Sequence, residues 1–162
     1  MEVEVVEHCE DNTFVLELST EEGMKEWGQV PLPPYIRKPP DNMERYQTIY
    51  AREPGSVAAP TAGLHFTREL MEGLSSQGVS RVYVTMHVGL DTFRPMKEAD
   101  PRRHKIHTEY FRLDPVVAAI INSTKREGGR IVAIGTTSVR TLEQASLWSR
   151  ARGKTELTPT SG

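Results

Sequence analysis

A cluster of hydroxyl side chains beside an arginine stands out at residues 130–143, which read RIVAIGTTSVRTLE. An apolar run ends at Gly135, and three hydroxyl residues and a cation follow it, namely Thr136, Thr137, Ser138 and Arg140. The pattern predicts a strand that leads into a helix, whose unpaired first amides suit an anion. The guanidinium adds a charge-assisted fork for a carboxylate or phosphate. An ordinary helix cap with a surface salt bridge is the open alternative, and the P-loop spacing is absent.

Two histidines lie where proton-transfer chemistry would need them. His65 ends the loop APTAGLH, in which Gly63 permits close backbone approach to a ligand. His87 lies near the end of the predicted strand RVYVTMHV. An imidazole titrates near neutral pH and can act as acid or base, although a structural hydrogen bond is the alternative for each.

The sequence does not predict a metal site. His104 and His107 are close in sequence, but no cysteine pair, carboxylate triad or HExxH motif accompanies them. The single cysteine, Cys9, cannot form an internal disulfide, which fits the cytoplasm. No apolar run approaches membrane length or forms a signal peptide, so we expect a soluble cytoplasmic protein without a membrane partner.

The net charge does not by itself indicate a nucleic-acid partner. The chain has 20 Lys and Arg against 22 Asp and Glu, which gives a formal charge of −2. A nucleic-acid surface would have to be a local basic patch, and residues 102–105 form the densest basic run. A solvated loop is the alternative interpretation of that run.

The elements that must position these residues alternate between strands and helices from Ser56 onward. Apolar periodicity predicts strands at 56–60, 81–88, 107–113 and 130–135, and helices at 67–78, 114–129 and 138–153. This order is typical of parallel strands with helical crossovers, so we expect an α/β domain, either barrel-like or an open sheet. The loops after parallel strands meet on one side. One shared cleft should therefore hold His65, His87, Asp91, Thr92, Thr136, Thr137, Ser138 and Arg140.

The first 54 residues have a different pattern. Residues 1–18 alternate and predict a β-hairpin, and the prolines of residues 31–40 exclude a helix or a central strand. We place a boundary near Pro54 and Gly55. Residues 1–54 are then a hairpin of an antiparallel sheet or barrel followed by a connector, and residues 55–162 are an α/β unit.

Six motifs, in order, resemble one enzyme family: PLPPYI, ERYQTIYA, AAPTAGLHF, VTMHVGLDTF, HTEYF and GTTSVRTLE. They span about Pro31 to Glu143 and closely resemble the S-adenosylmethionine:tRNA ribosyltransferase-isomerases of queuosine biosynthesis. Chains of that family are roughly twice this length, so the resemblance implies an internal fragment. In that fragment, residues 1–54 would be the remnant of an antiparallel β-barrel domain with a connector, and residues 55–162 would be a portion of the α/β catalytic domain. It also implies transfer and isomerisation of the ribosyl moiety of S-adenosylmethionine onto 7-aminomethyl-7-deazaguanine at the tRNA wobble position, which gives epoxyqueuosine.

The resemblance implies roles for the candidate residues. Its proton-transfer and base-binding groups would be His87, His65 and Asp91. Its cofactor-binding groups would be Gly63, Thr136, Thr137, Ser138 and Arg140. S-adenosylmethionine would be the ribosyl donor, with no metal required, and the partner would be tRNA bearing the aminomethyl-deazaguanine.

Two other functions remain open on the residues alone. One is a non-catalytic α/β domain that binds RNA or protein, and the other is a phosphosugar-binding lyase that uses the same strand-end cleft. We also expect this chain alone to be catalytically silent. Exposed apolar positions of the hairpin, such as Val3 and Phe14, predict self-association of the fragment, whereas the full-length family is expected to be monomeric.

Overall fold

The computed structural model describes residues 2–9, 13–23, 29–33, 36–38, 42–89, 92, 100 and 108–162. The chain forms two compact units, Met1–Val30 and Pro31–Gly162, which are described separately. The units divide after Val30, so the proline-rich connector groups with the second unit. The predicted assignment of residues 1–54 and 55–162 to two domains stays a prediction.

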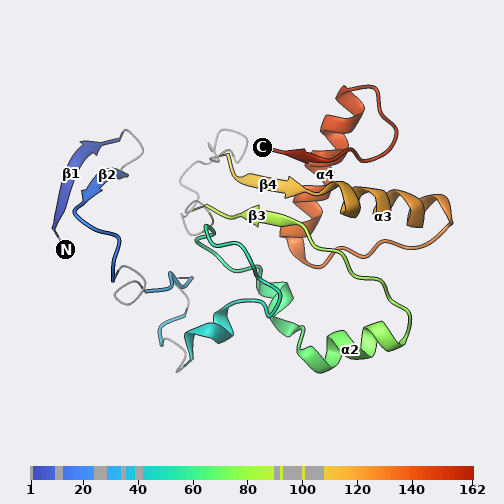
Figure 1. Cartoon of the computed structure of the whole chain (residues 1–162), viewed down its shortest axis with the longest axis horizontal. Coiled ribbons are helices and arrows are strands. Elements are labelled where there is room, and N and C mark those ends of the chain that lie inside the picture. The colour runs from blue at the N-terminus through green and yellow to red at the C-terminus, as the bar shows by residue number, and fades with distance from the viewer. Residues whose placement is uncertain are drawn as a thin grey trace. The chain divides into compact units, whose positions relative to one another are not determined.

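The first unit is a β-hairpin. Strand β1 (Val3–His8) pairs antiparallel with β2 (Phe14–Leu18), and a register shift lies between Val5 and Glu7. The hairpin expected from the alternating sequence is therefore confirmed (Figure 1). Its side chains are exposed except for the half-buried Leu18.

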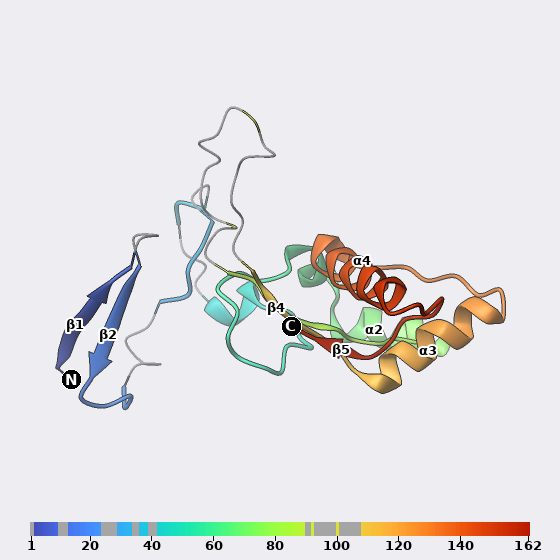
Figure 2. The same cartoon turned by 90° about the horizontal axis from the view of Figure 1, so that it is seen from above.

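The second unit contains one three-stranded sheet and three α-helices among its described residues. Its elements, in chain order, are η1 (Met43–Tyr46), η2 (Thr61–His65), α2 (Arg68–Ser76), β3 (Thr85–His87), β4 (Tyr110–Leu113), α3 (Pro115–Arg126), α4 (Gly135–Ala151) and β5 (Thr160–Ser161). The strand order is β3-β4-β5. Helix α4 lies along β4 in both views of the molecule (Figures 1 and 2).

The hydrophobic core lies where β4 meets α3 and α4. Phe111 and Leu113 project from one face of β4 and pack with Ala118 of α3 and Ala145 of α4. Trp148 of α4 adds an aromatic contact to Phe111, with ring centroids 5.2 Å apart. The strand alternates, so Tyr110 and Arg112 project from the opposite face. The alternation therefore gives the short sheet an apolar face toward the core and a more polar face on its other side.

The described strands pair differently from the sequence prediction. Both β3 with β4 and β4 with β5 are antiparallel, and no parallel pair occurs among the described residues. Residues 56–60 and 130–134 have no strand assignment. In the second stretch Ile131 and Val132 are 38% and 67% exposed, because no neighbouring strand in the described part of the chain covers them. The barrel-like or open parallel sheet stays a prediction.

The three predicted helices are all present, although α4 begins at Gly135 and not at the predicted Ser138. Helix α2 begins after Thr67, whose hydroxyl caps it by accepting the Leu70 N–H at 3.2 Å. Helix α3 begins at Pro115, a residue type that favours the first helical position. Asp114 precedes it without capping it, because its carboxylate instead accepts the Nε–H of Arg112 at 2.9 Å.

None of the helices in the described part of the chain combines the length and the apolar character needed to cross a membrane.

Candidate functional site

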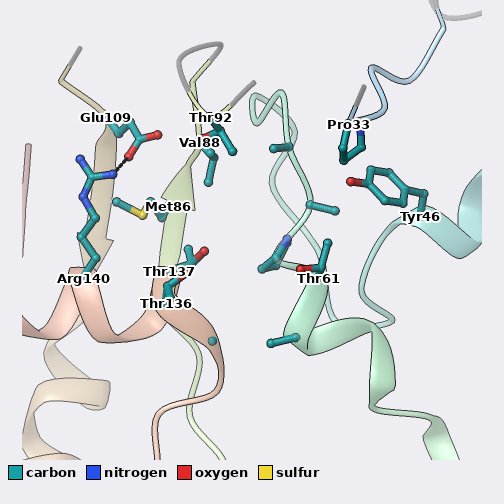
Figure 3. A pocket seen from close by; sticks show the side chains of 15 residues that line it. Pro33, Tyr46, Thr61, Met86, Val88, Thr92, Glu109, Thr136, Thr137 and Arg140 are labelled. Carbon is teal, nitrogen blue, oxygen red and sulfur yellow. Dashed lines mark hydrogen bonds and ion pairs between the residues drawn. The ribbon is translucent and has the colours of Figure 1, made fainter. Parts of the chain in front are cut away.

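A cavity of about 820 Å³ opens in the second unit, within the size range of small-molecule sites (Figure 3). Its walls come from the end of β3, the residue before β4, the first turns of α4, the stretch that enters η2, and two residues of the preceding segment. The lining residues are Pro33, Tyr46, Ala58, Ala59, Pro60, Thr61, Ala62, Met86, Val88, Thr92, Glu109, Gly135, Thr136, Thr137 and Arg140.

One wall of the cavity is polar and charged. Arg140 of α4 donates from Nη1 to Oε2 of Glu109, and Figure 3 shows this ion pair above Thr136 and Thr137. The Glu109 side chain is only 7% exposed, whereas that of Arg140 is 52% exposed. The other carboxylate oxygen of Glu109 accepts the N–H of Gly89 at 3.0 Å. Glu109 therefore ties α4 to the segment that follows β3.

The opposite wall carries an aromatic ring and small apolar groups. In Figure 3, Tyr46 and Pro33 lie together across the cavity from the ion pair, with Thr61 below them. Alanine side chains from residues 58–62 complete this side. A ligand with a charged end and a flat apolar end would match the two walls.

The start of α4 faces the cavity because of the glycine that begins it. Gly135 has φ +81°, a backbone conformation that favours glycine, and an added Cβ would lie 3.1 Å from Cβ of Ala62. The preceding residue, Ile134, provides no side-chain cap. In the described part of the chain, no side-chain cap is thus seen at the start of this 17-residue helix, whose first amides carry the positive end of its dipole beside Thr136 and Thr137.

The structure brings together some of the residues predicted to share a cleft. Thr136, Thr137, Arg140 and Thr92 all line the cavity. Ser138 and Gly63 are not among the lining residues; Gly63 is buried in η2, where it faces Tyr50 and Thr48. His65 is exposed at the end of η2. Asp91 lies outside the described residues.

The structure places His87 on the other face of β3. Its neighbours Met86 and Val88 line the cavity, so the alternation of the strand directs His87 away from it. The imidazole contacts the ring of Tyr110, with centroids 5.3 Å apart, and lies against Gly55, where an added Cβ would be 2.7 Å from Nδ1. Its Nε2 atom is buried without a hydrogen-bond partner among the described residues. The catalytic role of His87 stays a prediction.

A second ion-pair group lies on the His87 face of the sheet. The Arg112 guanidinium donates to both carboxylate oxygens of Glu53 and to Asp114. The hydrogen bond from Arg112 lowers the pKa of Glu53 below its usual value, and nearby His87 acts in the same direction. Elsewhere in this unit, burial raises the pKa of Tyr50, and its neighbour Tyr83 adds to the shift.

Sequence reasoning missed Glu109, the buried carboxylate of the cavity. A signal was present, because Glu109 alternates with Phe111 and Leu113, two apolar residues expected on the core face of a strand. The cavity residues Tyr46 and Pro33 gave no comparable signal, since their approach depends on tertiary contacts. The described residues contain no group of three or more His, Cys, Asp or Glu side chains that could hold a metal ion.

A family model and individual relatives both relate this chain to one protein family. A family model described as "Queuosine biosynthesis protein" matches residues 1–162. The S-adenosylmethionine:tRNA ribosyltransferase-isomerase of Desulforamulus reducens is 50% identical over 150 residues, which is 90% of this chain and 44% of the relative. Relatives of the same name from Symbiobacterium thermophilum and Dehalococcoides mccartyi are 59% and 51% identical over 72% and 90% of this chain.

The chain thus spans between 34% and 44% of the length of these relatives. The family model nevertheless covers every residue of it, and the order of motifs noted in the sequence agrees with that match. The chain belongs to the queuosine biosynthesis protein family.

Proposed function

We propose that this chain is a portion of an S-adenosylmethionine:tRNA ribosyltransferase-isomerase. The observation that carries the proposal is the 50% identity, over 90% of the chain, to a relative with that name. The substrates would be S-adenosylmethionine, as ribosyl donor, and a tRNA with 7-aminomethyl-7-deazaguanine at the wobble position. The product would be epoxyqueuosine in the tRNA, formed in the cytoplasm, with adenine and methionine released.

The chemistry of the cavity supports binding of S-adenosylmethionine. The methionine end of this molecule carries a carboxylate, which suits Arg140 and the uncapped start of α4. The adenine is flat and largely apolar, which suits the wall that holds Tyr46 and Pro33. The ribosyl group would then lie between the two walls, near Met86.

The proton transfers need residues other than those of the two cavity walls. A base must remove a proton next to the positively charged sulfur, and an acid must assist the departure of adenine. We assign these two steps to His87 and His65, and the binding of the deazaguanine or its amine to Asp91, on the family resemblance alone. Neither histidine lines the cavity, so a rearrangement that brings an imidazole to the ribosyl group is part of this proposal.

The tRNA would present its modified base outside the anticodon stack, as enzymes that act on a base require. The basic run at residues 102–105 is the proposed phosphate-binding patch. It lies outside the described residues.

The test is release of adenine by the product of the complete open reading frame that encodes this chain. With S-adenosylmethionine and tRNA bearing the aminomethyl-deazaguanine, we expect stoichiometric adenine release; with tRNA bearing guanine at the wobble position, we expect none. The 162-residue chain alone should be silent, because it spans under half of its relatives' length. Absence of release with the modified tRNA, together with tight binding of a phosphosugar, would favour the lyase instead.

A further inference from the structure

We propose that Glu109 is a positioning residue, which holds the Arg140 guanidinium at the cavity wall so that its remaining donors meet the carboxylate of S-adenosylmethionine. This inference rests on the proposed function and gives Glu109 a role that neither the motif HTEYF, which contains it, nor the family match assigns. It concerns the recognition of one ligand group, so it can be tested separately from turnover.

The hydrogen bonds of Glu109 define its role. One carboxylate oxygen accepts from the N–H of Gly89 and the other accepts from Nη1 of Arg140. Both oxygens are thus engaged, and the side chain is 7% exposed. A carboxylate in this state is poorly placed to act as a base or as a free counter-ion for the sulfonium. Its available function is to fix the cation beside it.

Arg140 keeps donors for a ligand while it is held. A guanidinium has five N–H donors in a rigid fork, and the bond to Glu109 engages one nitrogen. The side chain is 52% exposed and lines the cavity, so the fork is accessible from inside it. Thr136 and Thr137 lie on the same wall and offer hydroxyl donors to a second carboxylate oxygen.

The position of Glu109 anchors its carboxylate to the core. Glu109 immediately precedes β4, whose Phe111 and Leu113 are 4% and 1% exposed in the core. Its carboxylate is therefore anchored to the most buried strand of the sheet. An arginine on the surface turn of a helix would otherwise sample many rotamers, and holding it in one place reduces the entropy lost when a ligand binds.

The experiment compares S-adenosylmethionine with its decarboxylated analogue, which lacks the carboxylate, by calorimetry on the product of the complete open reading frame. The parent should bind S-adenosylmethionine at least about tenfold more tightly than the analogue, as expected for a charge-assisted pair. Glu109→Gln should reduce this preference to within about threefold, because the neutral amide no longer holds the guanidinium. Binding of the analogue itself should change little.

Glu156→Gln is the matched control. Glu156 pairs with Arg126 of α3 in an exposed ion pair, and neither residue lines the cavity. The same substitution there should leave the preference for the carboxylate unchanged. An equal loss of preference in both variants would overturn the positioning role, since it would reflect a general effect of removing a charge.

Arg140→Lys provides a second test of the inference if Glu109→Gln does not fold. Lysine retains the charge opposite Glu109 but loses the planar fork. The preference should fall about tenfold while the melting temperature stays near that of the parent. An unchanged preference in Arg140→Lys or in folded Glu109→Gln would overturn the inference and leave the proposed function standing. A parent that binds neither compound would overturn the proposed function itself, and the inference with it.

Discussion

Replacing Gly63 by alanine should destabilise the second unit through a steric clash. Gly63 is buried in η2, and its added Cβ would lie 2.7 Å from Cγ2 of Thr48 and 3.2 Å from Cζ of Tyr50, with the Tyr50 hydroxyl closer still. The Thr48 side chain cannot retreat easily, since the residue is 6% exposed. The Tyr50 ring is confined by Tyr83, with centroids 5.1 Å apart.

The expected change in the free energy of unfolding follows from two opposing effects. Overpacking of a buried site costs about 1–3 kcal/mol. Alanine also lowers the conformational entropy of the unfolded chain. This stabilises the folded state by about 0.4–1 kcal/mol when the folded backbone conformation tolerates alanine. Gly63 is not among the described glycines with a positive φ, so no conformational strain is added. We therefore expect Gly63→Ala to lower the free energy of unfolding by about 1–2 kcal/mol.

Urea unfolding of Gly63→Ala and Gly73→Ala in parallel tests this reasoning. Gly73 lies inside α2, and an added Cβ there meets nothing within 4 Å. The same substitution should therefore raise stability, by about 0.5–1 kcal/mol, through helix propensity. If Gly63→Ala is as stable as the parent, the steric argument fails. If it retains stability but loses S-adenosylmethionine affinity in the complete protein, Gly63 contacts the ligand, as the family resemblance implies.

Three further substitutions test other parts of the structure. Thr67→Ala should lower the stability of the chain by about 1 kcal/mol in urea, because the Leu70 N–H loses its cap; no change would show that the cap is not formed. Glu53 has a lowered pKa through Arg112, so its contribution to stability is present above the usual carboxyl pKa of 4.5 and lost as the pH falls through the lowered value. Glu53→Gln should remove that acid-dependent component from unfolding curves, and an unchanged pH profile would contradict the pairing. His87→Ala in the complete protein should slow adenine release by about a hundredfold or more with tRNA affinity retained, and a rate within about twofold of the parent would exclude a proton-transfer role.

The helices could be predicted from the sequence because their signals are local. Thr67 before one helix and Pro115 at the start of the next mark positions that backbone geometry restricts, whatever the surroundings. A side chain outside the helix nevertheless decides whether the residue before α3 caps it. Asp114 has a capping residue type but bonds to Arg112 instead, a choice that depends on the neighbouring strand.

The strands were harder to predict because a strand needs a partner. Residues 130–134 have the composition of a buried strand, yet Val132 is 67% exposed and the stretch pairs with nothing in the described part of the chain. Periodicity reports which side chains favour burial but not what is present to bury them. The parallel order expected for this region therefore depends on neighbours that these residues alone do not supply.

The candidate site was predicted in part, and the position of His87 shows one physical reason for the difference. Chain order grouped His87 with Thr136 and Arg140 because all three follow or end predicted strands. It did not consider which face of β3 His87 occupies. Met86 and Val88 reach the cavity, so the residue between them cannot.

The same alternation, applied to β4, explains why the cavity contains a buried carboxylate. It places Glu109 on the side of Phe111 and Leu113, where a carboxylate requires a partner, and Arg140 provides one from α4. A paired carboxylate, a half-exposed guanidinium and two threonine hydroxyls would suit the binding of an anionic group, and none of these four is a free base. If the cavity binds the methionine end of S-adenosylmethionine, the proton transfers must be made by residues other than these four. Loss of turnover in His87→Ala with cofactor affinity intact, against loss of affinity in Arg140→Lys, would separate these two functions within one active site.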